Sequence, residues 1–209
     1  MLVQKMDSDK ITDENLLGVV MPIQYFSLDR RGFYRVGESL GLFQQNPLTN
    51  SPLRSVPNLV APEDLQRHLE ELFPDGLSLH GWAYMSWYTD FLNSQGNQYV
   101  NYSSTLELAF EYVRRSSFAE CPSRLQCYFA FSSLDEARVF RATSGQANQP
   151  IYRLSADRVV QADQVWLRLG NQIAAASFYA YKFWSGAASP TPKWEHMLVP
   201  PVQVLEQMP

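Results

Sequence analysis

The chain has 209 residues, of which 45% are hydrophobic and 18% are charged, a composition that supplies a packed core and excludes an intrinsically disordered protein. Seventeen lysines and arginines against 21 acidic residues give a formal net charge of −4, which gives no argument for a broadly basic nucleic-acid or membrane-binding surface. We expect one domain over residues 16–209, preceded by a flexible, polar and acidic segment over residues 1–15.

The sequence lacks the common signatures of metal and nucleotide sites. Cys121 and Cys127 are six positions apart, which fits neither a redox pair nor a zinc site, so we expect two buried, reduced thiols. The three histidines lie far apart, and no metal site is predicted. No glycine-rich dinucleotide loop, P-loop or nucleophile elbow occurs. Residues 16–23 are apolar but too few to span a bilayer, and the acidic residues before them are unlike a signal peptide, so a cytoplasmic protein is expected.

The first half of the chain predicts one strand, one long loop and three helices. Residues 32–37 combine aromatic and β-branched side chains between two glycines, which indicates a short strand. The prolines and turn-forming residues of 44–61 predict a surface loop. A proline and an apolar stripe predict a helix over 62–73, and an aromatic run predicts one over 82–92. A capping box predicts a third helix over 105–115.

The second half alternates strands with helices. Residues 125–131 indicate a buried strand, and the capping box of Ser133 and Glu136 predicts that a helix follows. A long helix is predicted over 162–184, ended by Gly186. Further strands are expected at 151–154, 158–160, 194–199 and 202–205, with Pro200-Pro201 between the last two. The predicted fold class is therefore mixed α+β.

Three segments resemble the strand motifs of the ADP-ribosyltransferase superfamily. They are FYRVG at 33–37, YFAFSSLDEA at 128–137 and WEHMLVPPVQV at 194–204. The third is similar to the Glu-Tyr-Ile-Val pattern, with a later Gln-Val, of poly-ADP-ribose polymerases, and Tyr128-Phe129-Ala130 is similar to their Tyr-Phe-Ala strand. Over about residues 30–205 the chain also resembles an uncharacterised bacterial family with the same presumed fold, on residues 121–124, 134–137 and 181–186. The resemblance implies a split β-sandwich of two small sheets with flanking helices and a cleft that binds NAD.

The same resemblance assigns roles to individual residues. Glu195 would be the catalytic carboxylate, which holds the ribose 2′-hydroxyl and stabilises an oxocarbenium-like centre as nicotinamide leaves. Arg35 would anchor the ribose or phosphate of NAD, and Arg124 would be a second phosphate anchor. The candidates that wall the nicotinamide slot or contact the ribose are Tyr128, Phe131, Phe140 and Ser132. Each has a structural alternative: a solvated strand-end acid for Glu195, an ion-pair partner for Arg35 and plain core for Tyr128 and Phe140.

The resemblance implies a glycosyltransferase-class enzyme, a mono-ADP-ribosyltransferase that consumes NAD as a substrate and modifies a macromolecular target, as a bacterial toxin or effector. The acidic balance favours a protein target over nucleic acid, and an antitoxin or chaperone is a candidate partner. Delivery to a target cell by a route without a signal peptide is an open alternative to a purely cytoplasmic role. Two other functions stay open: a non-enzymatic interaction module on the same fold, and an NAD glycohydrolase.

Overall fold

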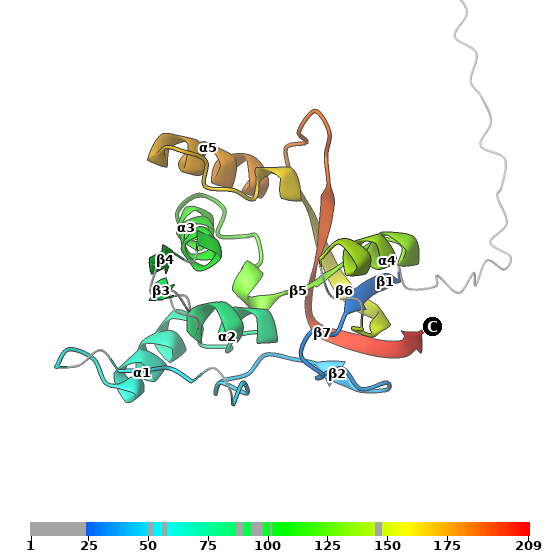
Figure 1. The fold of residues 1–209 in the computed structure, drawn as a ribbon, viewed down its shortest axis with the longest axis horizontal. Coiled ribbons are helices and arrows are strands. Elements are labelled where there is room, and N and C mark those ends of the chain that lie inside the picture. Colours follow the sequence, from blue (N-terminus) through cyan, green and yellow to red (C-terminus); the bar gives the residue numbers. More distant parts are fainter. Residues whose placement is uncertain are drawn as a thin grey trace, which may run out of the picture.

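The computed structural model describes residues 24–49, 52–55, 58–86, 90–92, 98–100, 102–144 and 148–209. The segment predicted to be flexible, residues 1–15, lies outside the described residues. Within the described part the fold is mixed α+β, as the sequence predicts, with a five-stranded antiparallel sheet, a separate two-stranded sheet and five α-helices (Figure 1).

Two long antiparallel strands, β6 and β7, form the centre of the main sheet. Its strand order is β1-β6-β7-β2, and β5 also pairs with β7. Backbone hydrogen bonds in both directions between Phe26 and Phe131 join β1 to the end of β5, so β1, β6, β7 and β5 follow one another in a closed ring. The strand bounds are β1 (Tyr25–Leu28), β2 (Ser39–Leu40), β3 (Asp90–Leu92), β4 (Gln98–Val100), β5 (Tyr128–Ala130), β6 (Ile151–Asp163) and β7 (Trp194–Met208), with β3 and β4 forming the small sheet.

The helices lie on two sides of the long strands. Helix α4 packs against β1, while the other four lie across β7 from it in Figure 1, where α3 packs on α5 and α2 on a short 3-10 turn that precedes β5. The helices are α1 (Pro62–Leu72), α2 (Leu79–Ser86), α3 (Tyr102–Ser117), α4 (Leu134–Thr143) and α5 (Ile173–Trp184), and the 3-10 turns are η1 (Arg124–Gln126) and η2 (Gln164–Trp166).

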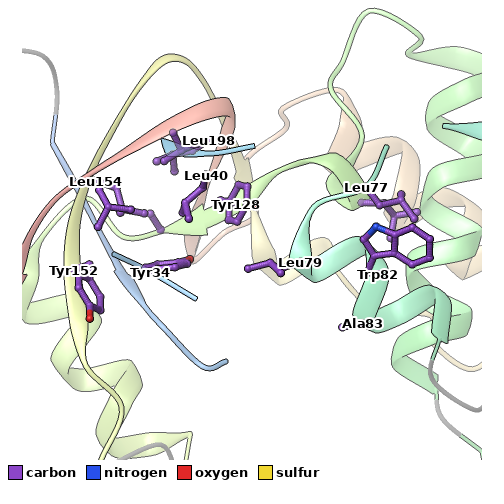
Figure 2. Packing of buried hydrophobic residues seen from close by; sticks show 14 of the residues in the cluster. Tyr34, Leu40, Leu77, Leu79, Trp82, Ala83, Tyr128, Tyr152, Leu154 and Leu198 are labelled. Carbon is purple, nitrogen blue, oxygen red and sulfur yellow. The ribbon is translucent and has the colours of Figure 1, made fainter. Parts of the chain in front are cut away.

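The core runs continuously from the sheet into the helical side. Tyr34, Tyr128 and Leu198 are buried beside the strands, and Leu79 lies between them and the group around Trp82 (Figure 2). A second cluster seals α3 and α5 onto β7 around Phe110, Phe183 and Met197, and a third joins α4 to β1. Full burial of each large apolar side chain contributes about 1.5–3 kcal/mol to folding. Trp82, the first residue of the aromatic run at 82–92, is fully buried and belongs to this core.

The strand predicted at residues 32–37 is wrong, because a turn occupies this segment. The carboxylate of buried Asp29 accepts hydrogen bonds from the backbone N–H groups of Arg31 and Phe33 at 3.1 Å and of Tyr34 at 2.8 Å. These bonds fold the chain back after β1, as Asp side chains do in turns. Gly32 takes a left-handed conformation, with φ +71°, which a strand does not allow.

The helix predicted over 162–184 is also wrong in its first half. Strand β6 continues to Asp163, whose buried carboxylate accepts from the backbone N–H of Val165 at 3.0 Å, of Ser189 at 2.7 Å and of Lys193 at 2.9 Å. The helical periodicity of the sequence does not reveal the bonds to Ser189 and Lys193, which are 26 and 30 residues from Asp163. Helix α5 begins only at Ile173, and Gly186, with φ +70°, follows its end as predicted.

Other elements agree with the sequence more closely. Helix α1 has its proline at the first position, and Ser133 caps α4 by accepting from the N–H of Glu136 at 3.2 Å. The strands expected at 151–154 and 158–160 are one strand, β6, and those flanking Pro200-Pro201 are one strand, β7. Both cysteines are free thiols; Cys127 is buried, which raises its pKa to about 12, whereas Cys121 is half-buried.

Gly81 allows α2 to lie directly on η1. A Cβ at this position would collide with the backbone oxygen of Leu125, which also accepts hydrogen bonds from Ser78. We expect Gly81→Ala to lower the free energy of unfolding by about 1–3 kcal/mol through overpacking. Urea denaturation measures the change, and Gly41→Ala, where a Cβ meets nothing within 4 Å, is the control.

Candidate functional site

The described residues enclose a cavity of about 360 Å³ between the sheet and helices α2 and α3. This volume lies within the range of roughly 300–1,000 Å³ typical of small-molecule sites. The walls come from β1 and the turn after it, the start of α2, one face of α3, η1, β5 and the first residues of β7. Residues from Ser27 to Glu195, far apart in the sequence, therefore line one hollow.

Arg124 is the central charge of the cavity wall. Its Nε and Nη2 each donate to the carboxylate of Glu107 at 2.9 Å, and its Nη1 donates to Oε1 of Glu195. The Arg124 and Glu107 side chains are each 4% exposed and that of Glu195 is 11% exposed. One buried guanidinium thus holds a carboxylate from α3 and another from β7, and the three groups carry a net charge of −1.

The Arg124 guanidinium packs over two aromatic rings. Its central carbon lies 4.5 Å from the centre of the Phe129 ring and 5.3 Å from that of Phe183. Burial alone would lower the pKa of Arg124, but the charges of Glu107 and Glu195 outweigh burial and raise the pKa above its ordinary value. Arg124 is therefore a permanent cation in the wall, well suited to fixing a carboxylate in place.

Glu107 and His80 form the helical side of the same wall. Although burial raises the pKa of Glu107, Arg124 and His80 lower it more strongly, to about 2, so this carboxylate is ionised at neutral pH. Nε2 of His80 lies 3.4 Å from Oε1 of Glu107, in electrostatic contact but without hydrogen-bond alignment. The imidazole ring lies 4.5 Å from the rings of both Tyr84 and Phe129, centre to centre.

Local folding explains why Arg124 and Glu195 meet. Ser123 caps the η1 turn by accepting from the N–H of Leu125 at 3.2 Å and donates its hydroxyl to Glu111 at 2.8 Å, which fixes the turn on α3. On the other side, Glu195 pairs with Ala162 in β6, next to the Asp163 carboxylate that holds the loop before β7. The η1 turn and the start of β7 are therefore each held in place by bonds other than the contact between Arg124 and Glu195.

The mouth of the cavity carries positive charge and aromatic rings. Arg30 and Arg31, from the turn after β1, line it, and the Arg30 guanidinium lies 4.9 Å from the centre of the Phe140 ring. Phe140 and Phe131 contact each other with ring centres 5.1 Å apart. Tyr34 lies deeper, and its burial raises its pKa to about 12, so it stays a neutral hydroxyl. An anionic group attached to a flat ring fits this chemistry.

The structure places five of the seven residues predicted from the sequence around this cavity: Glu195, Arg124, Tyr128, Phe131 and Phe140. Their individual roles remain predictions. Tyr128 is also core, since its hydroxyl donates to the backbone oxygen of Gly41 at 2.8 Å and its ring packs edge-on to Tyr34. Arg124, predicted as a second phosphate anchor, donates to two carboxylates, and its role toward a phosphate stays a prediction.

Arg35 and Ser132 do not line the cavity. Arg35 is exposed, and its Nη1 donates to the backbone oxygen of Tyr34 at 2.8 Å. The expected cleft shared by Arg35 and Glu195 is therefore wrong, because the Asp29 turn buries Tyr34 and directs the next residue outward. Ser132 donates to Glu136 at 2.8 Å, at the exposed start of α4.

Sequence reasoning missed His80, Glu107 and Arg30. A signal for Glu107 exists, because residues 107, 110, 111 and 114 form an i, i+3, i+4, i+7 stripe, and Phe110 on that stripe is fully buried. Two glutamates on a buried stripe require cations, and Arg114 and Arg124 supply them. His80 had no comparable signal, because it lies two residues before the aromatic run that starts at Trp82, and its partner Glu107 is on another helix.

A family model described as "Protein of unknown function (DUF2441)" matches residues 25–209. Every helix and strand of the described structure, and every residue that lines the cavity, falls inside this range. The chain belongs to the DUF2441 family. A comparison with curated proteins finds no match for this DUF2441 chain. Among its described residues, no helix combines the length and apolar character needed to cross a bilayer.

Proposed function

We propose that this protein is a mono-ADP-ribosyltransferase on an ADP-ribosyltransferase-like split β-sandwich, which cleaves NAD and transfers ADP-ribose to a protein target. One observation carries the proposal: the carboxylate of Glu195 faces a small-molecule-sized cavity that has aromatic walls and arginines at its mouth. Breaking the bond between nicotinamide and ribose needs a carboxylate beside the developing positive charge, an apolar slot for the leaving ring and cations for the pyrophosphate.

We assign each of these tasks to residues of the cavity. Arg124 fixes Oε1 of Glu195, and we assign Oε2 to the ribose 2′-hydroxyl, where it stabilises the oxocarbenium-like centre. Phe131 and Phe140 wall the nicotinamide slot. Arg30 takes the phosphate-anchoring role expected of Arg35. A second hollow of about 330 Å³ shares Ser103 and Leu106 with the first, and we assign the rest of the dinucleotide to it.

Incubation with NAD tests the proposal directly. We expect NAD to raise the melting temperature, nicotinamide to be released, and labelled ADP-ribose to appear on a protein when cell extract is added. Release of nicotinamide without a labelled protein supports an NAD glycohydrolase instead. Absence of both a thermal shift and nicotinamide release refutes the proposal.

A non-enzymatic interaction module on the same fold is the second candidate, favoured by one observation. Arg124 already satisfies both Glu107 and Glu195, so the three charges are a complete buried network without any ligand. In this case NAD produces no thermal shift, and neither the wild type nor Glu195→Gln releases nicotinamide.

Replacing Arg30 tests whether an arginine that lines the cavity contributes to NAD binding and a nearby exposed arginine does not. A hydrogen bond to a charged group contributes about 1.5–3 kcal/mol, and solvent screening at the cavity mouth reduces this contribution toward its lower end. We therefore expect Arg30→Ala to weaken NAD binding by about ten-fold. Isothermal titration calorimetry measures the affinity. Arg35→Ala is the matched control, five residues away and outside the cavity, and should bind NAD as the wild type does. Equal affinity in both variants would remove the arginine from the proposed site.

A further inference from the structure

We infer that His80 is a second catalytic residue of this site, a general base that takes the proton from a hydroxyl acceptor as it attacks the ribose of NAD. The inference rests on the proposed function and names its acceptor chemistry. It comes from the juxtaposition of the imidazole of His80 and the carboxylate of Glu195 in one cavity, on the two sides of the Arg124 network.

The imidazole is held in the manner of a catalytic base. Its ring lies between Tyr84 and Phe129, in contact with both, and Nε2 faces the Glu107 carboxylate at 3.4 Å. Nε2 is buried and makes no hydrogen bond with the described residues, yet the side chain is 22% exposed and lines the cavity. The buried Nε2 faces Glu107, which orients the ring, so Nδ1 is the nitrogen that takes the proton in the proposed step.

Arg124 determines where His80 and Glu195 lie relative to each other. It binds Glu107 through Nε and Nη2 and Glu195 through Nη1, so the two carboxylates lie at different edges of one planar guanidinium. His80 contacts the Glu107 side, and Glu195 lies on the other. His80 and Glu195 therefore line one cavity from different sides of Arg124, and we place the acceptor and the sugar in that cavity.

The proposed step balances in atoms and charge. The bond between C1 of the ribose and the nicotinamide nitrogen breaks, and its electron pair neutralises the pyridinium ring. The acceptor oxygen forms a bond to the same carbon, and its proton passes to the imidazole of His80. The resulting imidazolium faces Glu107, which is ionised and stabilises it, while Glu195 stabilises the positive charge that develops on the sugar.

A base is needed only for an acceptor that must lose a proton. Carboxylate acceptors are already ionised and need none, so the geometry points to a neutral hydroxyl, from a protein side chain or from water. Methanol is a suitable probe of this chemistry. With the wild-type protein and NAD, we expect ADP-ribose in water and additional methyl ADP-ribose when methanol is present, both formed at rates that depend on His80.

The test compares His80→Ala and His80→Gln with the wild type. We expect both to reduce kcat for nicotinamide release by about 10²-fold, the lower end for loss of a general base, with NAD affinity by calorimetry unchanged within about two-fold. Added imidazole should raise the rate of His80→Ala several-fold and leave that of Glu195→Gln unchanged. His68→Ala, on the exposed face of α1, is the matched control and should behave as the wild type.

The outcomes separate the two proposals. If the wild type cleaves NAD and the His80 variants cleave it equally fast, the inference about His80 is overturned while the proposed function stands. Loss of activity without rescue by imidazole, or with a parallel loss of NAD affinity, also overturns it, since either result indicates a structural role. If the wild type neither binds nor cleaves NAD, the proposed function fails, and the role of His80 fails with it.

Discussion

Glu195→Gln is expected to reduce nicotinamide release from NAD by about 10²–10³-fold, the effect of removing one electrostatic contact made to a transition state. Glutamine keeps the size of the side chain and an oxygen that accepts from Arg124, so NAD affinity and the melting temperature should change little. A loss confined to kcat is the expected signature, because the carboxylate charge acts only when positive charge develops on the ribose.

Glu206→Gln provides the control for this substitution. Glu206 lies in the same strand, β7, and its carboxylate is 3.1 Å from Nε of Arg153 on the neighbouring strand, far along the sheet from the cavity. It is about half exposed, so its loss should leave both turnover and stability within the error of measurement. Wild-type turnover in Glu195→Gln would falsify the catalytic assignment.

Arg124→Met is expected to lower the free energy of unfolding by about 3–5 kcal/mol at neutral pH, the cost of leaving buried carboxylates without their cation. Methionine fills much of the same space between Phe129 and Phe183, so the loss reports charge more than volume. Urea denaturation measures it. Arg138→Met is the control, because Arg138 pairs with Asp135 at 3.6 Å on the exposed face of α4 and should contribute less than about 1 kcal/mol.

The pH dependence of this difference follows from Glu107. Its folded pKa of about 2 lies below the ordinary value of 4.5, so in the wild type its contribution is complete above about pH 4.5 and is lost as the pH falls toward 2. Without Arg124, burial alone acts on Glu107 and favours its protonated form. The difference in free energy of unfolding between Arg124→Met and the wild type should therefore become smaller as the pH falls. At neutral pH, this difference should also become smaller when Glu107→Gln is added to Arg124→Met. A gap that does not change with pH would assign the loss to packing instead.

The elements that the sequence predicts well are those determined by neighbouring residues. Helix α1 follows from its proline and apolar stripe, and α4 from the Ser133–Glu136 capping box. The errors at 32–37 and 162–184 share one cause: a buried aspartate, Asp29 or Asp163, whose carboxylate binds three backbone N–H groups. For Asp163, two of these groups are 26 and 30 residues away, so no local pattern reveals them.

The site shows the same limit in its side chains. Glu195 and the aromatic residues of 128–140 are predicted from segments that resemble known motifs, and the structure places them around one cavity. The cation that faces Glu195 could not be identified in this way, because Arg35 and Arg124 are both plausible from sequence and only the fold decides between them. His80 required the packing of α2 on η1, which depends on the absence of a side chain at Gly81.

The Arg124 network has a consequence for when the cavity comes into existence during folding. Its two carboxylates are 17 and 71 residues from the arginine, so the hollow is assembled only after α3 has docked and β7 has joined the sheet. Contacts of such long range form late, after the entropy of closing large loops has been overcome. A nascent or proteolytically nicked chain that lacks β7 therefore lacks the wall of the cavity that Trp194 and Glu195 form.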